Sequence, residues 1–148
     1  MSGGALATTL AVAAGLAGSV QVAVMSRLGE RVGVVEAVAF AALLTAVIAV
    51  VALLVLRRSF AGVGHSVHQP WWMLTGGVLS LLIVFTITYA GPRIGVTATV
   101  GIIIGAQLVM GAAIDRFGLF GSSRVGLHWE RVLGIVLLAV GAALSLRK

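Results

Sequence analysis

The chain has 148 residues, of which 60% are hydrophobic and 9% are charged. Soluble domains carry about 25% charged residues, so a water-soluble fold is excluded because too little polar surface exists to cover so much apolar material. The absence of cysteine excludes disulfide bonds and thiol catalysis. The net charge is +6, but the basic residues are scattered between apolar runs and form no patch that could bind nucleic acid.

Five apolar segments approach the length that a helix needs to cross roughly 30 Å of hydrocarbon, which is about 20 residues. They cover approximately residues 4–26, 34–56, 71–90, 95–114 and 129–146. The loops expected between them cover residues 27–33, 57–70, 91–93 and 115–128, and none is long enough for a folded domain. We therefore predict an all-α, multi-pass bundle of five transmembrane helices that forms a single domain over residues 1–148.

The basic residues of the short loops normally orient a membrane protein, because the cytoplasmic side carries more of them. Five spans place Arg57, Arg58, Arg116, Arg124 and Arg131 on one side. They place Arg27, Arg31, Arg93, Arg147 and Lys148 on the other. Because the two sides carry equal numbers, the charges favour neither orientation.

Two interpretations of this balance remain open. In one, a partner protein or a dominant loop selects a single orientation. In the other, the chain inserts in both orientations and pairs with an antiparallel copy of itself. Many transporters are built from inverted repeats around a site at the membrane midplane. No inverted repeat is evident within the chain, so two copies would together supply a ten-helix, inverted-repeat homodimer.

Small residues inside the spans predict close helix packing, because lipid provides little hydrophobic drive between helices and close backbone approach replaces it. The chain has 20 glycines, most of them within apolar runs. The candidate packing positions are Gly18, Gly76, Gly101 and Gly105. Plain helix packing is favoured over a ligand role for each of them.

A few polar side chains lie inside the spans, where each costs free energy unless it finds a partner. Gln21 lies near the end of the first span, Thr86 and Tyr89 lie at the end of the third, and Gln107 lies past the middle of the fourth. We predict that these four residues line a substrate path. The alternative is that the glutamines only cross-link helices and that the threonine hydroxyl bonds to a carbonyl of its own helix.

Charged side chains lie only near the ends of the spans. Glu36 is one turn inside the second span, where it can reach the interface or pair with Arg31 or Arg93. Its shallow depth makes it a poor candidate for a proton-exchanging carboxylate. Asp115 lies at the end of a helix, where a negative charge opposes the helix dipole and requires a basic partner nearby. We predict Glu36, Arg93 and Asp115 as gate or structural charges. The absence of a central charge favours a neutral, zwitterionic or weakly polar solute.

Catalytic and metal-binding patterns are missing from the sequence. His65, His68 and His128 have no spacing that would make a metal site. A phosphate-binding loop, a nucleophile elbow and paired catalytic carboxylates are also lacking. We predict neither an enzyme nor a bound cofactor or metal.

Several short motifs resemble those of a known family. They are Pro70-Trp71-Trp72 before Gly76-Gly77, Gly91-Pro92-Arg93-Ile94-Gly95, Gly105-Ala106-Gln107-Leu108, and Asp115-Arg116-Phe117-Gly118-Leu119-Phe120-Gly121. This combination is similar to the YdcZ-type family, the half-length, five-helix members of the drug/metabolite transporter superfamily that are related to single EamA domains. The resemblance covers nearly the whole chain.

The resemblance implies a bacterial inner-membrane carrier that works by alternating access and consists of two five-helix units in inverted orientation. It also implies that Gln107 and Asp115 are motif positions of the family. We therefore expect a small-molecule transporter whose partners are the lipid bilayer, a small solute and a second copy of the chain. The alternative is a non-transporting scaffold or assembly subunit whose glycines serve only oligomerisation.

Overall fold

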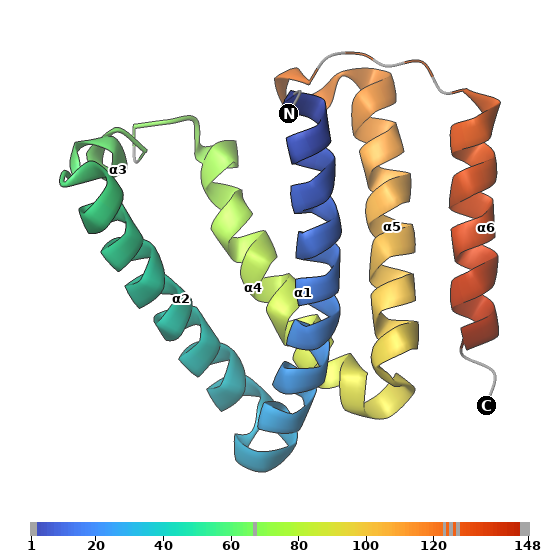
Figure 1. Ribbon diagram of the computed structural model, residues 1–148, viewed down its shortest axis with the longest axis horizontal. Coiled ribbons are helices and arrows are strands. Elements are labelled where there is room, and N and C mark those ends of the chain that lie inside the picture. The colour runs from blue at the N-terminus through green and yellow to red at the C-terminus, as the bar shows by residue number, and fades with distance from the viewer. Residues whose placement is uncertain (1–2, 67, 123, 125, 127, 146–148) are drawn as a thin grey trace. The chain divides into compact units, whose positions relative to one another are not determined.

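The computed structural model describes the whole chain except residues 1–2, 67, 123, 125, 127 and 146–148. The described residues form helices and contain no strand (Figure 1). The elements are α1 (Gly3–Val32), α2 (Val34–Arg57), α3 (Ala61–Ser66), α4 (Trp71–Ile94), α5 (Val96–Phe117), the 3-10 helix η1 (Leu119–Gly121) and α6 (Trp129–Ser145). The predicted all-α class is confirmed for this part of the chain.

Four helices in the described part of the chain, α1, α2, α4 and α5, are long and apolar enough to cross a membrane. They correspond to the first four predicted spans. The α6 helix has 17 residues, which gives it a length of about 25 Å, less than the roughly 30 Å of a hydrocarbon core. The predicted end of the fifth span at residue 146 lies outside the described residues, so a fifth membrane-crossing helix stays a prediction.

Two of the predicted loops are wrong, because the helices continue through them. Helix α1 includes residues 27–32, and α4 includes residues 91–94 with Pro92 inside its last turn. A single glycine turns the chain at each place, Gly33 between α1 and α2 and Gly95 between α4 and α5. A proline in the last turn removes only one helix hydrogen bond, which is why α4 does not end where its Gly-Pro pair predicts.

The other two predicted loops are partly helical. Residues 57–70 contain α3, and α5 continues past its predicted end at residue 114. Gly118 ends α5 in the left-handed conformation, with φ 65° and ψ 36°, and its N–H donates to the carbonyl of Ile114. A glycine adopts this conformation without the steric cost that a side chain brings. The turn after the fourth span therefore begins at Gly118.

The chain divides into two compact units. One consists of Met1–Ala23 with Arg93–Lys148 and the other of Val24–Pro92. Large apolar side chains are exposed in both, as Leu16, Val55 and Val78 show with exposed fractions of 69%, 70% and 70%. Soluble proteins rarely expose so much contiguous apolar surface, whereas helices that face lipid do.

Candidate functional site

Helices α5 and α6 pack against each other as an antiparallel pair within one compact unit (Figure 1). Small residues set their approach, because a Cβ built on Gly101 would lie 3.2 Å from the Cβ of Ala142. The connection over residues 118–128 brings the last turn of α5 and the first turn of α6 to the same end of the pair. Side chains from these two turns therefore meet there.

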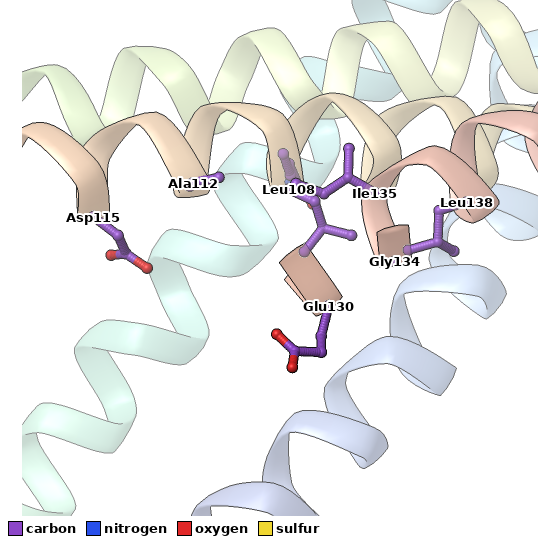
Figure 2. A pocket seen from close by; sticks show the side chains of 9 residues that line it. Leu108, Ala112, Asp115, Glu130, Gly134, Ile135 and Leu138 are labelled. Carbon is purple, nitrogen blue, oxygen red and sulfur yellow. The ribbon is translucent and has the colours of Figure 1, made fainter. Parts of the chain in front are cut away.

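A groove of about 520 Å³ lies between the two helices (Figure 2). It is lined by Gln107, Leu108, Gly111, Ala112 and Asp115 from α5 and by Glu130, Gly134, Ile135 and Leu138 from α6. Most of the wall is apolar, and the two carboxylates supply its negative charge. The structure thus brings together two of the predicted site residues, Gln107 and Asp115.

Helical spacing explains why these residues share the groove. Gln107, Gly111 and Asp115 follow one another at intervals of four on α5, so they lie on one face of the helix. Glu130 and Gly134 have the same spacing on α6. The glycine in the middle of each face leaves space where a larger side chain would fill the groove.

The two carboxylates have different relations to their helices. Glu130 lies in the first turn of α6, where the helix dipole stabilises a negative charge. Asp115 lies near the end of α5, where the dipole opposes it. Arg124 follows α5 in the chain and lies next to Gly118, the residue at which α5 ends. A Cβ built on Gly118 would be 3.3 Å from the Nε of Arg124. A guanidinium at the end of α5 offsets the negative end of the helix dipole, and a pairing of Asp115 with a basic residue stays a prediction.

The groove can bind a solute through several kinds of contact. The carboxylates accept hydrogen bonds or pair with a positive group, and the Gln107 amide both donates and accepts. No basic side chain lines the groove within the described part of the chain. No group of three or more His, Asp or Glu residues there could hold a metal ion. The groove therefore offers a bound solute negative charge and hydrogen-bonding groups.

The other predicted path residues lie elsewhere. Gln21 is exposed on α1 and does not line the groove. Thr86 and Tyr89 belong to α4, in the unit Val24–Pro92. The Thr86 hydroxyl donates to the carbonyl of Leu82 at 2.8 Å, and the Tyr89 ring stacks on Phe85 with centroids 6.2 Å apart. The Thr86 hydroxyl therefore bonds to a carbonyl of its own helix, which is the alternative to a role in the substrate path. A transport role for Gln21, Thr86 and Tyr89 stays a prediction.

Glu36 and Arg93 both lie next to a helix end. Glu36 is in the first turn of α2, and its carboxylate folds back against Gly33. Arg93 is in the last turn of α4. Each charge has the sign that its helix dipole stabilises at that end. These positions suit structural charges, and a gating role for either residue stays a prediction.

Of the four predicted packing glycines, Gly101 lies against another helix of the chain. A Cβ built on Gly18, Gly76 or Gly105 would meet nothing within 4 Å. These three glycines leave open space on the helix surfaces of the described chain. A role of these three glycines in helix packing stays a prediction.

Glu130 was not among the predicted site residues, although it lines the groove with Asp115. Glu130 follows Trp129 at the start of the shortest predicted span, and this position is typical of an ordinary charged residue at the membrane interface. The signal that could have identified it is its spacing to Gly134, which matches the spacing of Gly111 to Asp115 on the preceding helix. That match has meaning only if the two helices are known to pack together.

The family model described as "Putative inner membrane exporter, YdcZ" matches residues 6–144 of the chain. The inner membrane protein YdcZ of Escherichia coli (strain K12) is 28% identical over 138 residues, which cover 93% of this chain and 92% of that protein. No solved structure matches the chain. The predicted inner-membrane location is confirmed, and the match supports a membrane transporter in general. The chain belongs to the YdcZ family of the drug/metabolite transporter superfamily.

Proposed function

We propose that the chain transports a small solute by alternating access, as an antiparallel homodimer whose copies are inserted in opposite orientations. The solute site in this proposal is the α5–α6 groove. The observation that carries it is that Gln107, Asp115 and Glu130 converge on a groove whose walls are otherwise apolar. Such a combination of apolar walls with a few polar groups is typical of small-molecule sites.

The proposed solute carries an ammonium or another hydrogen-bond-donating group, because two carboxylates and no basic side chain of the described residues line the groove. The groove volume of about 520 Å³ lies within the range of small-molecule sites, roughly 300–1,000 Å³. An ammonium or hydroxyl group would bind at the carboxylates of Asp115 and Glu130, and an acceptor group would bind the Gln107 amide. The apolar part of the solute would contact Leu108 and Ile135.

Two observations support the paired arrangement. The basic residues are equally divided between the two sides predicted by five spans, so neither orientation is favoured. The glycines Gly18, Gly76 and Gly105 leave open space on three helices, which a second copy can fill by close backbone approach.

Flux through reconstituted protein tests the site. We expect Gln107→Leu to abolish uptake of neutral and zwitterionic solutes, such as labelled amino acids and polyols, into liposomes. Gln69→Leu is the matched control, because Gln69 lies outside α5 and α6, beside the start of α4. Undiminished flux in the Gln107→Leu chain would remove the groove from the proposal. No flux of any tested solute in the unsubstituted chain would favour the scaffold alternative.

Chemical labelling tests the paired orientation. The chain lacks cysteine, so a single cysteine added at either terminus can be labelled with a membrane-impermeant maleimide in intact cells. Insertion in both orientations predicts that about half of the molecules react for each terminus. Complete labelling at one terminus and none at the other would exclude dual topology.

A further inference from the structure

The two corners that turn on a single glycine have matching sequences. Residues 22–38 around Gly33 and residues 84–100 around Gly95 align without a gap. The identical pairs are Val22/Val84, Gly29/Gly91, Arg31/Arg93, Gly33/Gly95, Val34/Val96 and Val38/Val100. The conservative pairs are Met25/Ile87, Ser26/Thr88 and Val32/Ile94. Similarity in an apolar chain can arise from composition alone, so the structural match decides whether these segments correspond.

The backbone conformations of the two corners agree. Gly33 has φ 101° and ψ 149°, and Gly95 has φ 86° and ψ 156°. This part of backbone space is essentially restricted to glycine. The carbonyl of each corner glycine accepts a hydrogen bond from the N–H four residues later, at 3.0 Å from Ala37 and 3.1 Å from Thr99. Both corners therefore start the following helix in the same way.

Of the seven aligned positions that are buried in either segment, four are buried in both; at Val22/Val84, Glu36/Ala98 and Val38/Val100 only one member is buried. Met25, Ser26, Gly29 and Ala37 are buried in the first segment, and their counterparts Ile87, Thr88, Gly91 and Thr99 are buried in the second. Every buried residue of the described chain lies in one of the two segments. Beyond the second turn, neither α2 nor α5 has a buried residue among those described.

The two segments contact each other where α1 crosses α4, inside the unit Val24–Pro92. A Cβ built on Gly29 would lie 2.6 Å from Thr88 Cγ2 and 3.6 Å from the Thr88 carbonyl oxygen. Thr88 is fully buried, and its hydroxyl donates to the carbonyl of Val84 at 2.7 Å. The crossing is therefore closed, and only glycine fits at position 29 without displacing the buried Thr88 side chain or α4.

We infer that residues 22–38 and 84–100 are two copies of one helix–glycine–helix corner and that they form a device with two hinges. The α1–α4 crossing is its fixed part, and α2 and α5 turn about Gly33 and Gly95. Helix α6 packs on α5, so the groove between them moves with α5. The duplication and the hinges do not depend on the proposed transport function. Only the idea that this motion exposes the groove to solute rests on that function.

Stability tests the duplication. We expect Gly29→Ala and Gly91→Ala each to lower the melting temperature by about 5 °C or more. Gly18→Ala is the control, because its Cβ would meet nothing within 4 Å. A Gly91→Ala chain as stable as the Gly18→Ala chain would overturn the duplication. If Gly29→Ala fails to fold, adding Thr88→Ser removes the overlapping methyl group and should restore folding, and no recovery would overturn the closed crossing.

Distances between spin labels test the hinge at Gly33. Labels at Val51 and Val78 report the position of α2 relative to α4, and both side chains are exposed. Labels at Phe40 and Val55, both on α2, are the rigid control, about 22 Å apart by helical rise. We expect a broader distance distribution for the first pair than for the control, and we expect Gly33→Ala to shift its centre, because alanine rarely adopts the backbone conformation of this corner. A native distribution as narrow as the control would overturn this hinge.

The same measurement tests the second hinge. Labels at Val78 and Val109 report α5 relative to α4, and Gly95→Ala should shift the centre of their distance distribution as Gly33→Ala does for α2. A shift at one corner only would overturn the equivalence of the two hinges. Broad native distributions and shifts at both corners, in a chain that transports none of the tested solutes, would support the hinges and count against the proposed function alone.

Discussion

Replacing Gly29 by alanine perturbs the crossing of α1 and α4. The added Cβ would lie 2.6 Å from Thr88 Cγ2, whereas carbon atoms in contact are about 3.5–4.0 Å apart. Either the Thr88 side chain must therefore move or helices α1 and α4 must separate by about 1 Å at this point. Overpacking of this kind costs roughly 1–3 kcal/mol, which is about a 5- to 150-fold change in the unfolding equilibrium constant.

Thr88→Ser in the same chain provides the critical comparison. Serine lacks Cγ2 and keeps the hydroxyl that donates to Val84. The single Thr88→Ser change should cost roughly 0.5–1.5 kcal/mol, because it removes one buried methyl group. The double variant should then be more stable than the sum of the single changes predicts, because alanine at position 29 no longer overlaps the methyl group. The free energy of unfolding is measured by SDS titration in mixed micelles, with tryptophan fluorescence as the signal.

The result that would refute this reasoning is additivity. If the two changes add within about 0.5 kcal/mol, they do not share a contact. A Gly29→Ala chain that matches the Gly18→Ala control in stability would lead to the same conclusion, since the control places its Cβ in open space.

Three further predictions concern the groove and the helix contacts. Glu130→Gln should raise the half-saturating solute concentration about tenfold, because a hydrogen bond to a charged group contributes roughly 1.5–3 kcal/mol, and unchanged saturation would exclude Glu130 from binding. Gly101→Ala should lower the melting temperature, since its Cβ would lie 3.2 Å from the Cβ of Ala142, whereas the Cβ of Gly105→Ala would meet no atom within 4 Å and should weaken only cross-linking between copies; equal melting temperatures would contradict this. Pro92→Ala should increase the free energy of unfolding by roughly 1 kcal/mol, because it restores a helix hydrogen bond, and a decrease would show that the proline itself is needed in the last turn.

The hydrophobic pattern of the sequence predicted four of the helices well, and it misplaced their ends. In lipid, a chain must satisfy its backbone polar groups internally, so a long apolar segment forms a helix whatever its neighbours are. Helix ends depend on single residues with weaker preferences. The pair Gly91-Pro92 predicted a stop, yet the helix continues to Ile94, and Gly95 makes the turn in a conformation that other residues rarely adopt.

The sequence by itself determined the class of protein, the family motifs and two of the groove residues, Gln107 and Asp115. Only the tertiary structure decided that Glu130 joins them and that Gly29 lies against Thr88. Helix formation depends on local hydropathy, which can be seen along the chain. Helix pairing depends on how the surfaces of two helices fit, and the residues that make the fit are far apart in the sequence. For that reason, the composition of this chain predicts a membrane bundle, and the contacts between its helices determine where a solute could bind.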